Sequence, residues 1–256
     1  MKKSIKFFLF IILSFSFVLS KDHHVFAQSN NIPKELLEVV TKIDLAANNQ
    51  DLKLIEQNIS PKFTTEDGLN YENFTSSLKN LWSKYKDLKY TTKIESWKQN
   101  QDQLVATTIT NIQGSYDING KKFTLNSEIK SEQYFLNNQL IKQKILTEKN
   151  EVTSGEKPPI ATVNLPQKAR PGQEFDFDVI LQDPIGSYSV LGGVLENKID
   201  SSLYLKPSTL ELDTLSAGGI FKRVKLPMTP EDHWYSVILI NTDGMRMITQ
   251  RVNVEG

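Results

Sequence analysis

The chain has no cysteine and only three histidines among its 256 residues. Without cysteine there is no disulfide, no thiol nucleophile and no thiol for lipid attachment. His23 and His24 fall within the first 27 residues, so the rest of the chain keeps only His233. A metal site needs three or four ligands, and no HxH or CxxC spacing occurs. We therefore expect no metal and no cofactor.

The motifs of several common active sites are also missing. The sequence has no G-x-S-x-G elbow, no G-x-x-x-x-G-K-[ST] loop and no D-x-D-x-D-G loop, which argues against Ser-His-Asp catalysis, P-loop nucleotide binding and an EF-hand calcium site. Residues 1–27 hold four of the 30 basic and one of the 30 acidic residues, so residues 28–256 carry a net charge of −3. No basic block stands out, and we expect no nucleic-acid partner.

Long apolar runs are scarce, and the one that occurs lies near the N-terminus. It covers residues 7–19 (FFLFIILSFSFVL), follows a basic head and precedes the small residues of Val25-Phe26-Ala27. Its 13 residues are fewer than the ~20 that cross a bilayer. We predict that residues 1–27 are a signal peptide, with a retained anchor as the weaker alternative. The protein is then exported to a periplasm, a lumen or the extracellular space, and has no stable membrane anchor after cleavage.

A change in composition near residue 150 predicts two domains. Residues 149–159 (KNEVTSGEKPP) contain Ser, Gly, Pro and charges and almost nothing apolar, which is typical of a linker. We predict a first domain over residues 28–150, a linker over 151–158 and a second domain over 159–256.

The first domain begins with helical periodicity and continues with strands. Apolar stripes three and four residues apart predict helices over 33–47, 51–58 and 70–85. The period then changes to two, which predicts four strands over 89–98, 103–116, 121–136 and 139–148. Asn119-Gly120 and Asn137-Asn138 supply tight turns between them. Three helices followed by long antiparallel strands predict an α+β layer.

This order of elements resembles the NTF2-like superfamily of SnoaL-like or cystatin-like cones. The segments that carry the resemblance are the helical stripe from Leu36 to Ala47, residues 58–63 (NISPKF), residues 81–85 (LWSKY) and residues 131–135 (SEQYF). The resemblance implies three N-terminal helices on a curved antiparallel sheet. It also implies a pocket between them, and a homodimer through this domain.

The second domain shows only short strands and turns. About seven strands in about 98 residues predict an all-β sandwich. Asp232-His233-Trp234-Tyr235 resembles the corner of immunoglobulin-like domains, with Tyr235 as the residue that ties the entering loop. We expect a disulfide-free relative of that fold.

Alternation along strand 121–136 selects the candidate ligand-binding residues. The face that carries its apolar residues also carries polar ones, and Gln143 lies on the neighbouring strand; the candidates are Ser127, Ser131, Gln133 and Gln143. None of them is a base for proton transfer. The acids Glu128 and Glu132 fall on the opposite face, unless a one-residue bulge reverses the assignment. Those four residues then either bind a ligand or only satisfy one another and water.

These observations favour an exported, non-catalytic binding or docking protein of the bacterial cell envelope. It binds either a small ligand in the NTF2-like cone or a protein partner. The alternative is a cone-type enzyme, isomerase- or hydrolase-like, with a buried carboxylate or tyrosine; its test residues are Asp44, Tyr90 and Glu128. A third alternative, an envelope scaffold, predicts an exposed apolar patch that includes Trp97 or Leu191.

Overall fold

The computed structural model describes residues 31–182, 189–204, 211–215 and 218–255. The predicted signal peptide lies outside the described residues. Among those described, no helix is both long and apolar enough to cross a membrane.

Three helices form close to where the periodicity places them. They are α1 (Lys34–Asn48), α2 (Leu52–Asn58) and α3 (Tyr71–Lys84). The side chain of Asp51 accepts hydrogen bonds from two backbone N–H groups at the start of α2, and Asn70 does the same for Asn73 at the start of α3. Both side chains satisfy donors that the helix itself leaves unpaired.

The strands of the N-terminal half are long. They are β1 (Ile59–Thr65), β2 (Lys89–Asn100), β3 (Gln103–Ile118), β4 (Lys121–Leu136) and β5 (Gln139–Gly155). The hairpin between β3 and β4 turns at Asn119 and Gly120, whose φ angles of 51° and 77° suit the primed turns that match strand twist. β5 runs through residues 151–155, which we assigned to a linker, so these residues belong to a strand.

The C-terminal half contributes eight further strands. They are β6 (Ala161–Asn164), β7 (Lys168–Ala169), β8 (Glu174–Leu181), β9 (Leu191–Lys198), β10 (Asp213–Thr214), β11 (Gly219–Lys225), β12 (His233–Ile240) and β13 (Gly244–Val254).

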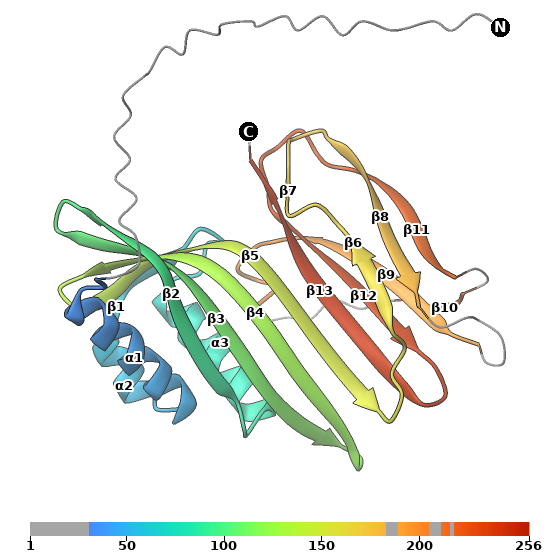
Figure 1. The fold of residues 1–256 in the computed structure, drawn as a ribbon, viewed down its shortest axis with the longest axis horizontal. Helices are drawn as coiled ribbons and strands as arrows, with labels where there is room; N and C mark the ends of the chain where they lie inside the picture. Colours follow the sequence, from blue (N-terminus) through green and yellow to red (C-terminus); the bar gives the residue numbers. More distant parts are fainter. Residues whose placement is uncertain (1–30, 183–188, 205–210, 216–217, 256) are drawn as a thin grey trace, which may run out of the picture.

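One large sheet runs through both halves of the chain (Figure 1). Its order is β10-β9-β12-β13-β5-β4-β3-β2, with β1 paired to β5 and β7 paired to β13. The junction is the antiparallel pair of β13 and β5, from Gly244 opposite Gly155 to Gln250 opposite Lys149. β6, β8 and β11 form a separate sheet of three strands.

The predicted fold class is therefore wrong. Strands predominate, the three helices are short, and the two halves share one sheet. An α+β cone joined by a linker to an independent immunoglobulin-like β-sandwich does not describe this arrangement. The physical reason is the length of β5, whose outer half offers free backbone groups that β13 satisfies.

The two faces of the large sheet are covered by different layers. The helices pack on one face at β2–β5, in a core that also takes Met245 and Met247 from β13. The three-stranded sheet packs on the opposite face, where Phe177 and Val179 meet Val237 and other residues of β12 and β13. Because side chains alternate along β13, this one strand supplies both cores.

Bulges change which residues face the helices. On β2, Ile94 pairs with Thr108 and Ser96 with Thr107, so Glu95 is an extra residue. Trp97 therefore turns to the helix-covered face and packs against that core. Without the bulge, alternation would place Trp97 on the opposite face, with Lys93 and Glu95, where the envelope-scaffold alternative requires it. Leu191, the other candidate for an exposed patch, is 39% exposed.

Candidate ligand cavity

A cavity of about 250 Å³ lies between the helices and the helix-covered face of the large sheet. Its walls come from α1, α2 and α3 on one side and from β1–β5 on the other, and Tyr204 is also part of the lining. Most of the lining is aliphatic or aromatic: Ile43, Ala47, Ile55, Ile59, Leu69, Phe74, Leu78, Leu81, Ile112, Ile129, Leu140 and Ile145. An apolar hollow with a few polar groups is the usual composition of a small-molecule site.

A carboxylate from α1 contributes the first polar group of the wall. Asp44 accepts a hydrogen bond from the backbone N–H of Thr92 and another from its hydroxyl, both at 2.7 Å. The hydroxyl of Thr92 lies 3.0 Å from that of Thr110 on β3. All three residues line the cavity, and these bonds fix α1 to the sheet at this point.

Two glutamine side chains form the second polar group. Gln133 on β4 and Gln143 on β5 are directly opposite in the register, and both line the cavity. Nε2 of Gln143 donates to the hydroxyl of Ser131 at 3.1 Å, and that hydroxyl lies 3.2 Å from the hydroxyl of Thr108. Gln133 is 9% exposed, and its side chain has no hydrogen bond to another described residue.

The four residues proposed from the sequence therefore divide into two pairs. Gln133 and Gln143 reach the cavity. Ser131 is fully buried behind them and supports Gln143, while Ser127 donates to Asn150 at 2.6 Å. Neither serine is part of the lining. A role in binding stays a prediction for all four residues.

A third polar group was missed by the sequence analysis. Glu148 on β5 lines the cavity, and its side chain is 8% exposed. On β5, Ile145 pairs with Ser131 and Thr147 pairs with Lys130, so Leu146 is an extra residue. Because of the bulge, the side chain of Glu148 points to the helix-covered face, where Glu148 pairs with Ile129 of β4. Strict alternation from Gln143 and Ile145 would instead place Thr147 on this face.

The side chain of Asn253 holds the bulge. Its Nδ2 donates a hydrogen bond to the carbonyl of Leu146. Asn253 is buried and comes from the last strand, more than 100 residues away. The residues of β5 alone do not predict the bulge, because the side chain that binds it, Asn253, lies in β13.

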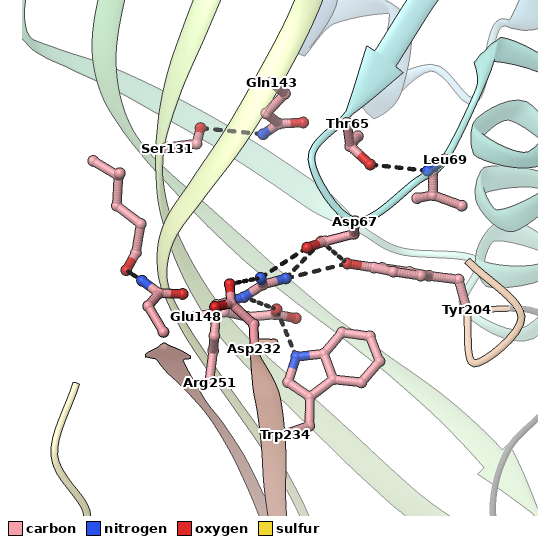
Figure 2. A network of polar contacts seen from close by, with 12 residues as sticks. Thr65, Asp67, Leu69, Ser131, Gln143, Glu148, Tyr204, Asp232, Trp234 and Arg251 are labelled. Carbon is pink, nitrogen blue, oxygen red and sulfur yellow. Dashed lines mark hydrogen bonds and ion pairs between the residues drawn. The ribbon is translucent and has the colours of Figure 1, made fainter. Parts of the chain in front are cut away.

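Glu148 belongs to a buried charged cluster (Figure 2). Arg251 is at its centre, with a side chain that is 1% exposed. Its guanidinium binds both carboxylate oxygens of Asp67 at 2.9 and 2.6 Å, and Asp232 at 3.0 Å. Its Nε lies 3.5 Å from Glu148. One guanidinium thus meets three carboxylates drawn from a loop, β5 and the segment before β12.

Two aromatic side chains complete the cluster. Trp234 donates its indole N–H to Glu148 at 2.9 Å, and Tyr204 donates its hydroxyl to Asp67 at 2.5 Å. Burial and the charges of Glu148 and Asp67 raise the pKa of Tyr204 far above its usual value. Burial alone would lower the pKa of Arg251, but the hydrogen bond to Asp67 and the nearby carboxylates outweigh it and raise that pKa. Both groups therefore keep their protons at any ordinary pH.

Of the three residues that test for a catalytic site, two line the cavity and the third, Glu128, does not. Asp44 and Tyr90 line the cavity, and Tyr90 accepts a hydrogen bond from the indole of Trp82 at 3.2 Å. Burial raises the pKa of Tyr90 to about 12, although the bond from Trp82 opposes the change. Glu128 is exposed on the far face of β4. The acid that does line the sheet wall is Glu148 of β5, and Glu128 of β4 faces away as predicted.

No group of three or more His, Cys, Asp or Glu side chains in the described part of the chain has the geometry to hold a metal ion. The acids around Arg251 bind its guanidinium.

Comparison with known proteins gives one family match. Residues 156–255 match the model of a family described as a domain of unknown function (DUF8623). This match covers less than half of the chain, and its description assigns no activity. Among curated proteins, none matches the sequence.

Several solved structures align with 43% of the chain. The IdmH 96–104 loop truncation variant aligns over 89% of its own length, with 11% identity and a TM-score of 0.33. An LEH-like epoxide hydrolase from M. tuberculosis aligns over 80%, with 8% identity and a TM-score of 0.30. Bd1075 from Bdellovibrio bacteriovorus aligns over only 38% of its length, with 22% identity and a TM-score of 0.32.

The first two of these proteins have SnoaL/NTF2-like cone folds, the type expected for the first half; an immunoglobulin-like second half is not confirmed.

Proposed function

We propose that this is an exported, non-catalytic protein that binds a small, mostly apolar ligand in the cavity between the helices and the large sheet. The observation that carries the proposal is the combination of a hollow of about 250 Å³ with the unpartnered amide of Gln133 in its wall. A dry cavity of ~150 Å³ accommodates benzene, so the expected ligand is somewhat larger. Binding removes its apolar surface from water.

The state of the carboxylates supports a binding role over catalysis. Glu148 accepts hydrogen bonds from Trp234 and Asn150 and contacts Arg251, while both oxygens of Asp44 are engaged by Thr92. A general base must be free to take a proton from the substrate. Both carboxylates here are already committed to partners that hold the fold together.

The cone-type enzyme stays as the second candidate because Glu148 lines the cavity. If Glu148 were a base, Glu148→Gln would abolish turnover of a substrate without changing its affinity. In a binding protein, Glu148→Gln changes the stability of the fold or the affinity for the ligand, and neither the wild type nor the variant turns over a substrate.

Thermal melting with p-cresol tests the cavity. Its size suits the hollow, and a ligand that binds only the folded state raises the melting temperature. Ser77 lines the cavity and Ser76, its neighbour on α3, is exposed. We expect p-cresol to raise the melting temperature of the wild type and of Ser76→Phe, but not of Ser77→Phe, which fills the hollow. A wild type that shows no shift contradicts the proposal.

Export is tested separately by N-terminal sequencing. The chain is expressed in a bacterium from Met1, and the protein recovered from outside the cytoplasm should begin at Gln28. Recovery of the uncleaved chain from the membrane fraction would instead support the retained anchor.

A further inference from the structure

We infer that the cavity recognises an uncharged ligand that ends in a primary amide and has an apolar body. The inference rests on the proposed function and names the class of ligand for that site.

The first step is the free hydrogen-bonding capacity of the two glutamines. Gln133 as a whole residue is more than nine-tenths buried, and its side chain has no hydrogen bond to another described residue. Gln143 uses its Nε2 on Ser131, which leaves its Oε1 without a bond to another described residue. The two glutamines therefore offer the NH₂ group of Gln133, the second N–H of Gln143 and two carbonyl oxygens. These groups face the open space of the cavity. A ligand that displaces water from them without pairing them would lose free energy, so a ligand that pairs them is favoured.

The second step is the closeness of the two side chains. Gln133 and Gln143 are directly opposite on β4 and β5, where Cβ atoms lie about 5 Å apart. One ligand group can therefore meet both. The carbonyl of a primary amide accepts from Nε2 of Gln133, while its two N–H groups donate to Oε1 of Gln133 and Oε1 of Gln143.

The third step excludes ligands whose polar end group is charged. Among the described residues that line the cavity there is no lysine, arginine or histidine, and the two charged residues, Asp44 and Glu148, are acidic. The guanidinium of Arg251 is already occupied by Asp67, Asp232 and Glu148. A carboxylate ligand would have no counter-ion and would be repelled. An ammonium only donates, so the Nε2 of Gln133 would stay unpaired. Glu148 already contacts Arg251, and both oxygens of Asp44 already accept hydrogen bonds from Thr92.

Titration of the wild-type protein with three probes that share an apolar tail tests the inference. The probes are hexanamide, hexanoate and hexylammonium at pH 7, followed by NMR through the side-chain NH₂ signals of glutamine. We expect hexanamide to bind at least about tenfold more tightly than either charged probe, as expected for one to two hydrogen bonds. We also expect it to shift the NH₂ signal of Gln133.

A pair of variants gives the matched control. Gln133→Leu should weaken hexanamide binding about tenfold, whereas Gln113→Leu, on the exposed face of β3, should leave it unchanged. If none of the three probes nor p-cresol binds the wild type, the proposed function itself fails. If hexanoate or hexylammonium binds as tightly as hexanamide, the cavity binds ligands but the inference is wrong. That comparison needs no variant, so it stands even if Gln133→Leu does not fold.

Discussion

Arg251 and Asp67 form a bidentate ion pair, with distances of 2.9 and 2.6 Å between the guanidinium nitrogens and the carboxylate oxygens. The residues are 184 positions apart. Asp67 lies in the loop between β1 and α3, and Arg251 lies near the end of the last strand. The pair therefore joins the helix-bearing half of the molecule to the C-terminal half, in addition to the sheet that they share.

Arg251→Met should strongly destabilise the protein. Removal of the guanidinium leaves Asp67 and Glu148 as buried carboxylates without their cation, and such changes cost about 3–5 kcal/mol. Urea denaturation followed by circular dichroism measures the loss. The control is Arg223→Met, which removes exposed ion pairs to Glu174 and Asp176 and should cost less than about 1 kcal/mol. Equal losses for the two variants would contradict a structural role for the cluster.

Asn253→Ala should loosen the bulge at Leu146. The carbonyl of Leu146 loses the side-chain donor that now satisfies it, and an unsatisfied buried carbonyl costs about 1–3 kcal/mol. Hydrogen exchange of the amides at residues 145–148 should speed up more than exchange elsewhere in β5. An unchanged exchange rate in this stretch would mean that the bulge is held by the strands alone.

Stability should fall in acid partly through Glu196. Its contact with His233 and the hydroxyl of Tyr235 lower its pKa, against the opposing effect of burial. The folded state therefore binds the proton less readily than the unfolded state. The contribution is present above the ordinary pKa near 4.5 and is lost as pH falls through the lower folded value. Denaturation of Glu196→Gln from pH 3 to 7 should show a smaller acid-induced decline than the wild type. Parallel curves would contradict the assignment.

Stability should also fall in alkali through Tyr90. Burial raises its pKa to about 12, while an unfolded tyrosine ionises near ~10. Its contribution is full below pH 10 and is lost as pH rises toward the folded value, a change of about 2 kcal/mol. Tyr90→Phe should therefore lose less stability between pH 10 and 12 than the wild type does. A steeper decline in the variant would contradict the sign of the effect.

The sequence by itself determined the local elements of the N-terminal half. The apolar stripes place α1 and α3 within a residue or two of their observed bounds, and Asn119-Gly120 marks the hairpin between β3 and β4. Alternation along β4 also puts Ser127, Ser131 and Gln133 on its buried face and Glu128 on the exposed one. These features depend on neighbours along the chain, which is why a sequence pattern can reveal them.

Only the tertiary structure decided how the halves join and which acid reaches the cavity. β13 pairs with β5 through backbone N–H and C=O groups, which are nearly the same for every residue type. The composition near residue 150 therefore predicts a linker, although the strand β5 continues to Gly155. The bulges at Glu95 and Leu146 reverse the alternation and bring Trp97 and Glu148 to the helix-covered face. Asn253, which is distant in sequence, stabilises the bulge at Leu146. The alternation of residues along β5 alone therefore does not predict this bulge.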